Sequence, residues 1–184
     1  MIPLRTAIFA SIVTTTTLSL AASLPRNTNV VVCQPNAAGC IHHNIFGHDY
    51  KILNTDRFTV MVFLSSEGPY TRADVSITNL TPTPINLYPE DFHIQALATR
   101  SKVFLYVPPS QLDDLTIFTK ANTSPEISDP EAANPHLKAI TIPPNQAVHG
   151  RVYFERDPSA TPQQVNIVMP IAGTVFKFPD VIKP

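Results

Sequence analysis

The sequence predicts an all-β protein, an antiparallel β-sandwich with one short helix in a long inserted loop. Two observations carry this prediction. Nineteen prolines and only five glycines are spread along the 184 residues, and such regular breaks disfavour long helices and suit short strands joined by turns. Between the breaks, apolar residues alternate with polar ones, which is the pattern of a strand with one buried face.

The strongest strand patterns lie in the first half of the chain. Every second residue from Phe58 to Leu64 is apolar, and Met61 and Phe63 make the opposite face apolar too, so 57–65 is predicted to be a central, covered strand. Residues 73–79 alternate most regularly, which predicts a strand whose polar residues, beginning with Asp74, face water. The other strands are predicted at 45–53, with Gly47 interrupting, at 92–96 and 103–107 as a hairpin, and at 140–142, 148–155, 165–169 and 174–178.

One helix is predicted in the insertion between the hairpin and the C-terminal strands. Ser110 is placed to cap its first turn, Asp113 suits the positive helix start, and Leu112, Leu115 and Phe118 follow at roughly helical spacing. The insertion from Pro108 to His136 is long for a compact domain, and we expect it to supply a contact surface, because long loops on a rigid scaffold commonly carry binding.

The N-terminus predicts export. Residues 1–23 have Arg5, an uncharged stretch to Leu20 and small residues before a cleavage point, as in a secretory signal peptide. The stretch is too short and too rich in threonine to span a bilayer. We therefore predict a secreted or periplasmic protein with no membrane span after cleavage. The remainder divides into an N-terminal segment, 24–56, and a sandwich domain, 57–184.

Cys33 and Cys40 are the only cysteines. Thiols oxidise outside the cytoplasm, so we predict one disulfide that closes a small loop and pins the N-terminal segment. A lipid anchor at Cys33 is not predicted, because valines precede it where a lipoprotein signal has a small residue.

The charge pattern argues against nucleic acid as a partner. The chain has 13 basic and 14 acidic residues, a net charge of -1, and its basic residues form no cluster. Nucleic acid and anionic membranes attract basic patches, so neither is an expected partner.

Three histidines, His42, His43 and His48, lie close together in the sequence and suggest a copper or zinc site. The alternative is an exposed polar segment beside the disulfide. Neighbouring residues on a strand point to opposite faces, so only one of His42 and His43 can join His48 if the segment is a strand.

A resemblance to known domains rests on Ile140–Glu155, Val75–Asn79 and Phe92–Ile94. Together these segments resemble the small immunoglobulin-like domains of exported bacterial proteins, in which a strand ending in asparagine, a phenylalanine strand, a proline turn, a glycine and a strand closing with Phe-Glu follow one another. Pro144-Asn145 replaces the usual Pro-Gly, and asparagine also tolerates a positive φ. The resemblance implies an immunoglobulin-like sandwich without catalytic residues or cofactors.

Hydrolase motifs such as Gly-x-Ser-x-Gly and His-Glu-x-x-His do not occur in the sequence. The leading expectation is therefore a non-enzymatic module for interaction, adhesion or the cell envelope, with an unknown protein or envelope partner. A metal-binding protein that uses the three histidines is the second expectation. A hydrolase assembled from scattered residues, with Glu90, Asp91, Asp113, Asp114 and Glu155 as candidate carboxylates, is the third.

Overall fold

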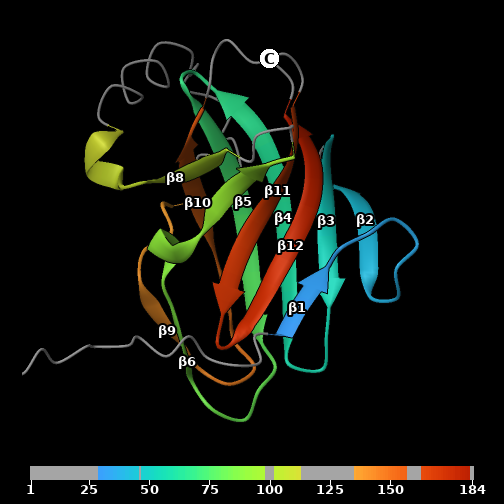
Figure 1. The fold of residues 1–184 in the computed structure, drawn as a ribbon. Helices are drawn as coiled ribbons and strands as arrows, with labels where there is room; N and C mark the ends of the chain where they lie inside the picture. Colours follow the sequence, from blue (N-terminus) through green and yellow to red (C-terminus); the bar gives the residue numbers. More distant parts are fainter. Residues whose placement is uncertain (1–28, 46, 98–101, 113–134, 157–162, 183–184) are drawn as a thin grey trace, which may run out of the picture.

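The structure is a computed structural model that describes residues 29–45, 47–97, 102–112, 135–156 and 163–182. The predicted signal peptide and most of the long insertion lie outside these residues. The described chain contains twelve strands and two short 3-10 turns, and no α-helix occurs in it (Figure 1). The prediction of an all-β protein is confirmed.

Ten strands form one continuous sheet in the order β1-β12-β11-β7-β8-β10-β5-β4-β3-β2, and β6 pairs with β9 in a small second sheet. The strands of the large sheet are β1 (Asn29–Val32), β2 (Cys40–Ile45), β3 (His48–Asn54), β4 (Phe58–Glu67), β5 (Tyr70–Asn79), β7 (His93–Ala96), β8 (Val103–Val107), β10 (Ala147–Glu155), β11 (Gln163–Ile171) and β12 (Thr174–Ile182). The small sheet contains β6 (Ile85–Leu87) and β9 (Ile140–Ile142).

The large sheet curls into a half-barrel, so that β12 lies in front of β4 (Figure 1). Strand β8 makes the turn from one layer to the other: Val103–Leu105 pair with β7, whereas Tyr106 and Val107 pair with β10. β1 runs parallel to β12. Two stacked layers are therefore present, but they belong to a single sheet, and the immunoglobulin-like arrangement of two separate sheets is not confirmed.

The core lies between the two layers. The apolar residues of β4 and β5 that alternation assigns to one face are buried, and Phe58 meets Phe176 of β12 edge to face with ring centroids 5.8 Å apart. Burying a side chain of this size stabilises the fold by about 1.5–3 kcal/mol. We call the side of the sheet that faces this core the inner face and the opposite side the outer face.

The predicted strands are confirmed with modest shifts. The strand predicted at 45–53 corresponds to β3 and the last residue of β2, and Gly47, with φ 85°, lies in the turn between them. β1 and the rest of β2 were not predicted as strands. The hairpin of β7 and β8 and the four C-terminal strands also form as predicted. The Pro-Asn turn survives the loss of glycine because Asn145 adopts φ 57°.

The predicted helix requires correction. Its first residues, Pro109–Gln111, form a single 3-10 turn capped by Pro108, with no side-chain cap hydrogen bond. Ser110 lies inside this turn and so does not cap a helix. The remaining residues of the prediction, from Asp113 onward, lie outside the described part of the chain.

Asn79, the last residue of β5, links the large sheet to the small sheet. Its side chain is fully buried, and its amide Nδ2 donates to the carbonyl oxygens of Thr83 (2.9 Å) and Ile142 (3.0 Å). Its Oδ1 accepts from the backbone N–H of Thr81 (3.0 Å) and from that residue's hydroxyl (2.7 Å). This amide holds the loop after β5 against β9. Asn79-Leu80-Thr81 matches the N-glycosylation acceptor pattern, and the burial of Asn79 takes this match out of solvent.

Candidate functional site

The half-barrel has an open side, the seam, where the outermost strands β1 and β2 leave the two layers unjoined by strand pairing. The disulfide closes one end of this seam. Cys33 follows β1 and Cys40 begins β2, and the structure joins the two sulfur atoms, as predicted from the sequence. Cys33 is 2% exposed and belongs to the core. The bond therefore ties the first edge of the sheet to the last.

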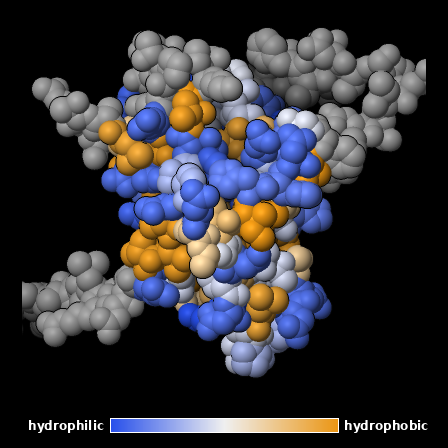
Figure 2. Space-filling model, turned by 90° about the vertical axis from the view of Figure 1, so that its right-hand side faces the viewer, coloured by the Kyte–Doolittle hydropathy of each residue, from blue (hydrophilic) through white to orange (hydrophobic). Residues whose placement is uncertain are grey.

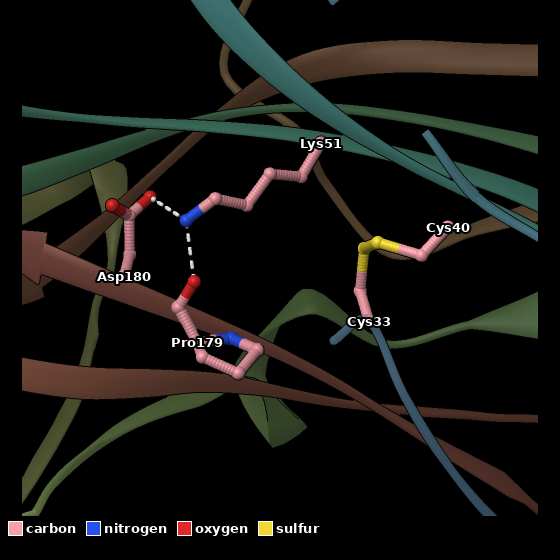
Figure 3. The surroundings of a disulfide bond; sticks show 5 residues. All are labelled: Cys33, Cys40, Lys51, Pro179 and Asp180. Atoms are coloured by element: carbon pink, nitrogen blue, oxygen red, sulfur yellow. Dashed lines mark hydrogen bonds and ion pairs between the residues drawn. A yellow bond between two sulfur atoms is a disulfide. The ribbon is translucent and has the colours of Figure 1, made fainter. Parts of the chain in front are cut away.

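An ion pair bridges the seam beside the disulfide. Lys51 of β3 extends across the gap to β12, where its ammonium contacts the Asp180 carboxylate at 2.9 Å and donates to the Pro179 carbonyl (Figure 3). The Lys51 and Asp180 side chains are 14% and 27% exposed. Because both side chains are partly shielded from water, salt screens this pair less than it screens an exposed ion pair.

A cleft of about 670 Å³ opens along the seam next to this ion pair. Its walls come from the β2–β3 hairpin, the end of β4 and the end of β12. The lining combines charged or polar side chains with apolar ones. The charged and polar residues are His42, His48, Asp49, Lys51, Ser65, Ser66 and Asp180. The apolar residues are Phe63, Leu64, Val181 and Ile182. A volume of this size is typical of a site for a small ligand or for the side chains of a partner.

The pairing register shows where the three histidines lie. His42 is opposite Lys51, which reaches across the seam, whereas His43 is opposite Tyr50 on the other face. His48 packs on the outer face against Phe63, with ring centroids 4.5 Å apart. His42 and His43 therefore point to opposite faces, and the three side chains do not converge.

No group of three or more His, Cys, Asp or Glu side chains suited to a metal ion occurs among the described residues. The carboxylates considered for hydrolysis are also dispersed. Glu90 and Asp91 belong to the 3-10 turn Pro89–Asp91, Glu155 ends β10 in an exposed position, and Asp113 and Asp114 lie outside the described residues. None of the described three lines the seam cleft.

A second polar cluster, missed by the sequence analysis, lies on the outer face of β4, β5 and β10. Arg72 bridges Glu67 and Asp74 with contacts of 3.1 Å each, and Arg151 approaches Asp74 at 3.8 Å. Asp74 was predicted to face water but is 4% exposed, because two guanidinium groups contact it, Arg72 from its own strand and Arg151 from the neighbouring β10. Only strand pairing brings Arg151 beside Asp74, so the alternation within residues 73–79 could not show this burial.

Tyr153 completes this cluster. It is buried, its hydroxyl donates to Glu67 at 3.2 Å, and its ring meets Tyr70 edge to face. Burial, followed by the charge of Glu67, raises the pKa of Tyr153 to about 12. His136, at the end of the long insertion, packs on the same ring, and burial and the charge of Arg151 lower the pKa of this histidine. The described ends of the insertion thus cover this cluster.

No family model matches the chain, and no curated protein matches it. Among solved structures, the chain is similar to a "putative lipoprotein (ycdA)" from Bacillus subtilis subsp. subtilis str. 168, with a TM-score of 0.46 and 15% sequence identity over 71% of this chain. The match covers 38% of that protein's chain, so this chain spans well under half of its length. Within the described residues, no helix is long and apolar enough to cross a bilayer.

Proposed function

We propose that this protein is an exported, non-enzymatic β-sandwich of immunoglobulin-like descent that binds a protein or envelope partner in the seam cleft. The single observation behind this proposal is the construction of the cleft. Its charged groups Lys51 and Asp180 are engaged with each other across the seam, and the rest of the lining combines apolar side chains such as Phe63, Leu64 and Val181 with a few polar ones. Such a lining suits recognition of a partner's side chains, because apolar contacts supply affinity and a few placed polar groups supply orientation.

The location outside the cytoplasm rests on the signal-peptide pattern and on the disulfide. Disulfides persist in oxidising compartments, and this one ties together the two edge strands that frame the cleft. Cell fractionation tests this part of the proposal. We expect the processed, disulfide-bonded protein in the secreted, periplasmic or envelope fraction, and recovery of a reduced, unprocessed chain in the cytoplasm would contradict it.

Photocrosslinking tests the cleft itself. A benzophenone amino acid in place of Val181, which is 47% exposed at the cleft, should form covalent adducts with the partner in cells that naturally produce the protein. The matched control carries the same group in place of Leu105, which is 59% exposed on β8 and does not line the cleft. Adducts at neither position, or equally at both, would remove the cleft from the account.

The hydrolase alternative is tested separately. Purified protein should show no turnover of chromogenic esters, phosphates or glycosides above the buffer rate. Turnover that disappears when a cleft residue such as Asp49 is changed to Asn would contradict a non-catalytic role and identify the cleft as an active site instead.

A further inference from the structure

The free edge of β2 is an uncommon feature for a stable exported domain. β2 is the last strand of the large sheet, and among the described strands its one partner is β3. Four successive residues, Ile41 to Asn44, are exposed, so none of the residues that the structure describes covers this edge. In Figure 1 the strand lies at the outer margin of the fold, and Figure 2 shows the molecule from that side.

The hydrogen-bond phase shows which backbone groups point outward. The N–H of Asn54 donates to the carbonyl of Gly39 at 2.8 Å, which makes this a hydrogen-bonded pair. In an antiparallel ladder such pairs alternate, so Ile41, His43 and Ile45 bond to β3. The N–H and C=O groups of His42 and Asn44 consequently point away from the sheet, where they can pair with another extended strand.

Natural proteins protect such edges with lysine, proline or bulges. The small sheet of this protein follows that rule, because prolines flank both of its strands, Pro84 before β6 and Pro143 after β9. The sequence of β2, Cys-Ile-His-His-Asn-Ile, contains no lysine, proline or acidic residue. An uncharged, regular edge of this kind favours strand addition.

The sequence of β2 is also complementary to itself. In a two-fold antiparallel pairing centred on His43, the outward-bonding residue His42 meets the second copy's Asn44, and the reciprocal pair forms on the other side of the axis. Each such pair can exchange two N–H···O=C bonds. On the outer face, the His43 side chains of the two copies face each other at the axis. Ile41 meets the second copy's Ile45 on one side of them, and Ile45 meets the second copy's Ile41 on the other. The strand carries no charge that would repel its copy.

We propose that β2 is a self-association edge, through which two copies of this chain pair antiparallel about His43. The inference does not depend on the seam cleft being the binding site. If both hold, however, the two clefts flank one interface, because His42 of each copy lines a cleft, and the dimer presents two linked sites to a repetitive partner.

The pairing is small, so the dimer should be weak. An interface well below the standard size is typical of transient complexes, and we expect a dissociation constant on the order of 100 µM. Sedimentation equilibrium of the full, disulfide-bonded protein should show a monomer–dimer equilibrium between about 10 µM and 1 mM, a range that brackets this expected affinity. A protein that stays monomeric throughout this range overturns the proposal.

Two sets of variants locate the interface. His43→Lys should weaken association at least tenfold, while Leu105→Lys, at an exposed apolar position of β8, should leave it unchanged. His43→Cys should form an intermolecular disulfide, because facing residues of a non-hydrogen-bonded pair lie close together. Ile41→Cys should crosslink far less, because that residue faces the second copy's Ile45. Dimerisation that survives His43→Lys, or equal crosslinking by both cysteine variants, places the contact elsewhere and overturns the proposal.

Discussion

The fully buried amide of Asn79 offers the sharpest test of how this fold is held together. Asn79→Asp changes the side chain by one atom and keeps its volume, so it alters hydrogen bonding without creating a cavity. In the native protein, Nδ2 donates to the carbonyl oxygens of Thr83 and Ile142 at 2.9 and 3.0 Å. In the variant, a carboxylate oxygen faces the same two carbonyl oxygens and donates to neither.

The magnitude follows from these contacts. Both carbonyl oxygens lose the amide donor, although the Thr83 oxygen also lies 2.8 Å from the Thr81 hydroxyl. Leaving a buried polar group unpaired costs about 1–3 kcal/mol, more when a charge is buried beside it. Thr81 still finds an acceptor, which limits the loss. We therefore expect Asn79→Asp to lower the free energy of unfolding by about 3 kcal/mol at pH 7, which corresponds to a fall in Tm of roughly 6 to 12 °C for a domain of this length.

The loss should also depend on pH in a defined direction. Burial beside two carbonyl oxygens raises the folded-state pKa of the new carboxyl, because its charged form has no compensating donor. A neutral carboxyl can donate to one of the two carbonyls. The variant is thus nearest to wild type below the unfolded pKa of aspartate, about 4, and loses stability progressively as the pH rises through the folded-state value.

Urea unfolding followed by far-ultraviolet circular dichroism at pH 4 and pH 7 measures both effects. The control is Asn86→Asp, where an exposed asparagine only accepts a hydrogen bond from Thr141 at 2.8 Å and a carboxylate can accept the same bond. The control should cost less than about 0.5 kcal/mol. A loss below about 1 kcal/mol for Asn79→Asp at pH 7, or a loss that shrinks as the pH rises, would refute the reasoning.

Three further predictions follow from the same geometry. Gly150→Ala should lower the free energy of unfolding by about 1–3 kcal/mol, because the added Cβ would lie 2.7 Å from the Pro135 carbonyl oxygen. The control is Ala147→Val, at an exposed site of the same strand. Equal losses for the two variants in denaturant melts would contradict the steric argument. In an ultraviolet titration, Tyr153 should be the last tyrosine to ionise, because its pKa is raised to about 12, and Tyr153→Phe should remove this last step. The stabilisation from its neutral phenol is lost only as the pH rises from 10.0 toward that value. Ionisation of all tyrosines together near pH 10 would contradict the prediction. If copper or zinc binds to the histidine segment, calorimetric titration should show that His42→Ala leaves binding intact while His43→Ala weakens it. The reason is that His43 points to the outer face, where His48 lies, whereas His42 points to the opposite face. Equal loss from both variants, and from His48→Ala, would support the three-histidine site.

The buried face of a strand could be predicted from the sequence wherever burial depends only on the alternation of residues within that strand. From Phe58 to Leu64 the alternation of apolar residues placed the inner face correctly, because a strand's faces follow directly from its period of two. The same rule failed at Asp74, because its burial depends on Arg72 and on Arg151, which comes from β10. The predicted cap at Ser110 also failed, because Pro108 and Pro109 start a 3-10 turn before that serine. Leu115 and Phe118, on which the helical spacing rested, lie outside the described residues.

The candidate site was only partly predictable. The disulfide followed from two cysteines in an exported chain, and the division of His42 from His43 followed from strand geometry. The seam cleft could not be predicted, because it depends on the curl of the sheet that brings Lys51 of β3 within 2.9 Å of Asp180 of β12. No local pattern records a contact between residues so far apart in the chain.

By itself, the amino-acid sequence determined the all-β class, the boundaries of most strands, the disulfide pairing and the expectation of export, because each depends on local periodicity or on the presence of a residue type. The tertiary structure decided that the two layers are one sheet, that its two edges meet across a seam bridged by Lys51, and that β2 is left as an open edge. These features arise from the order of the strands in the sheet. That order depends on the packing of the whole core, because all strands must bury their apolar faces together.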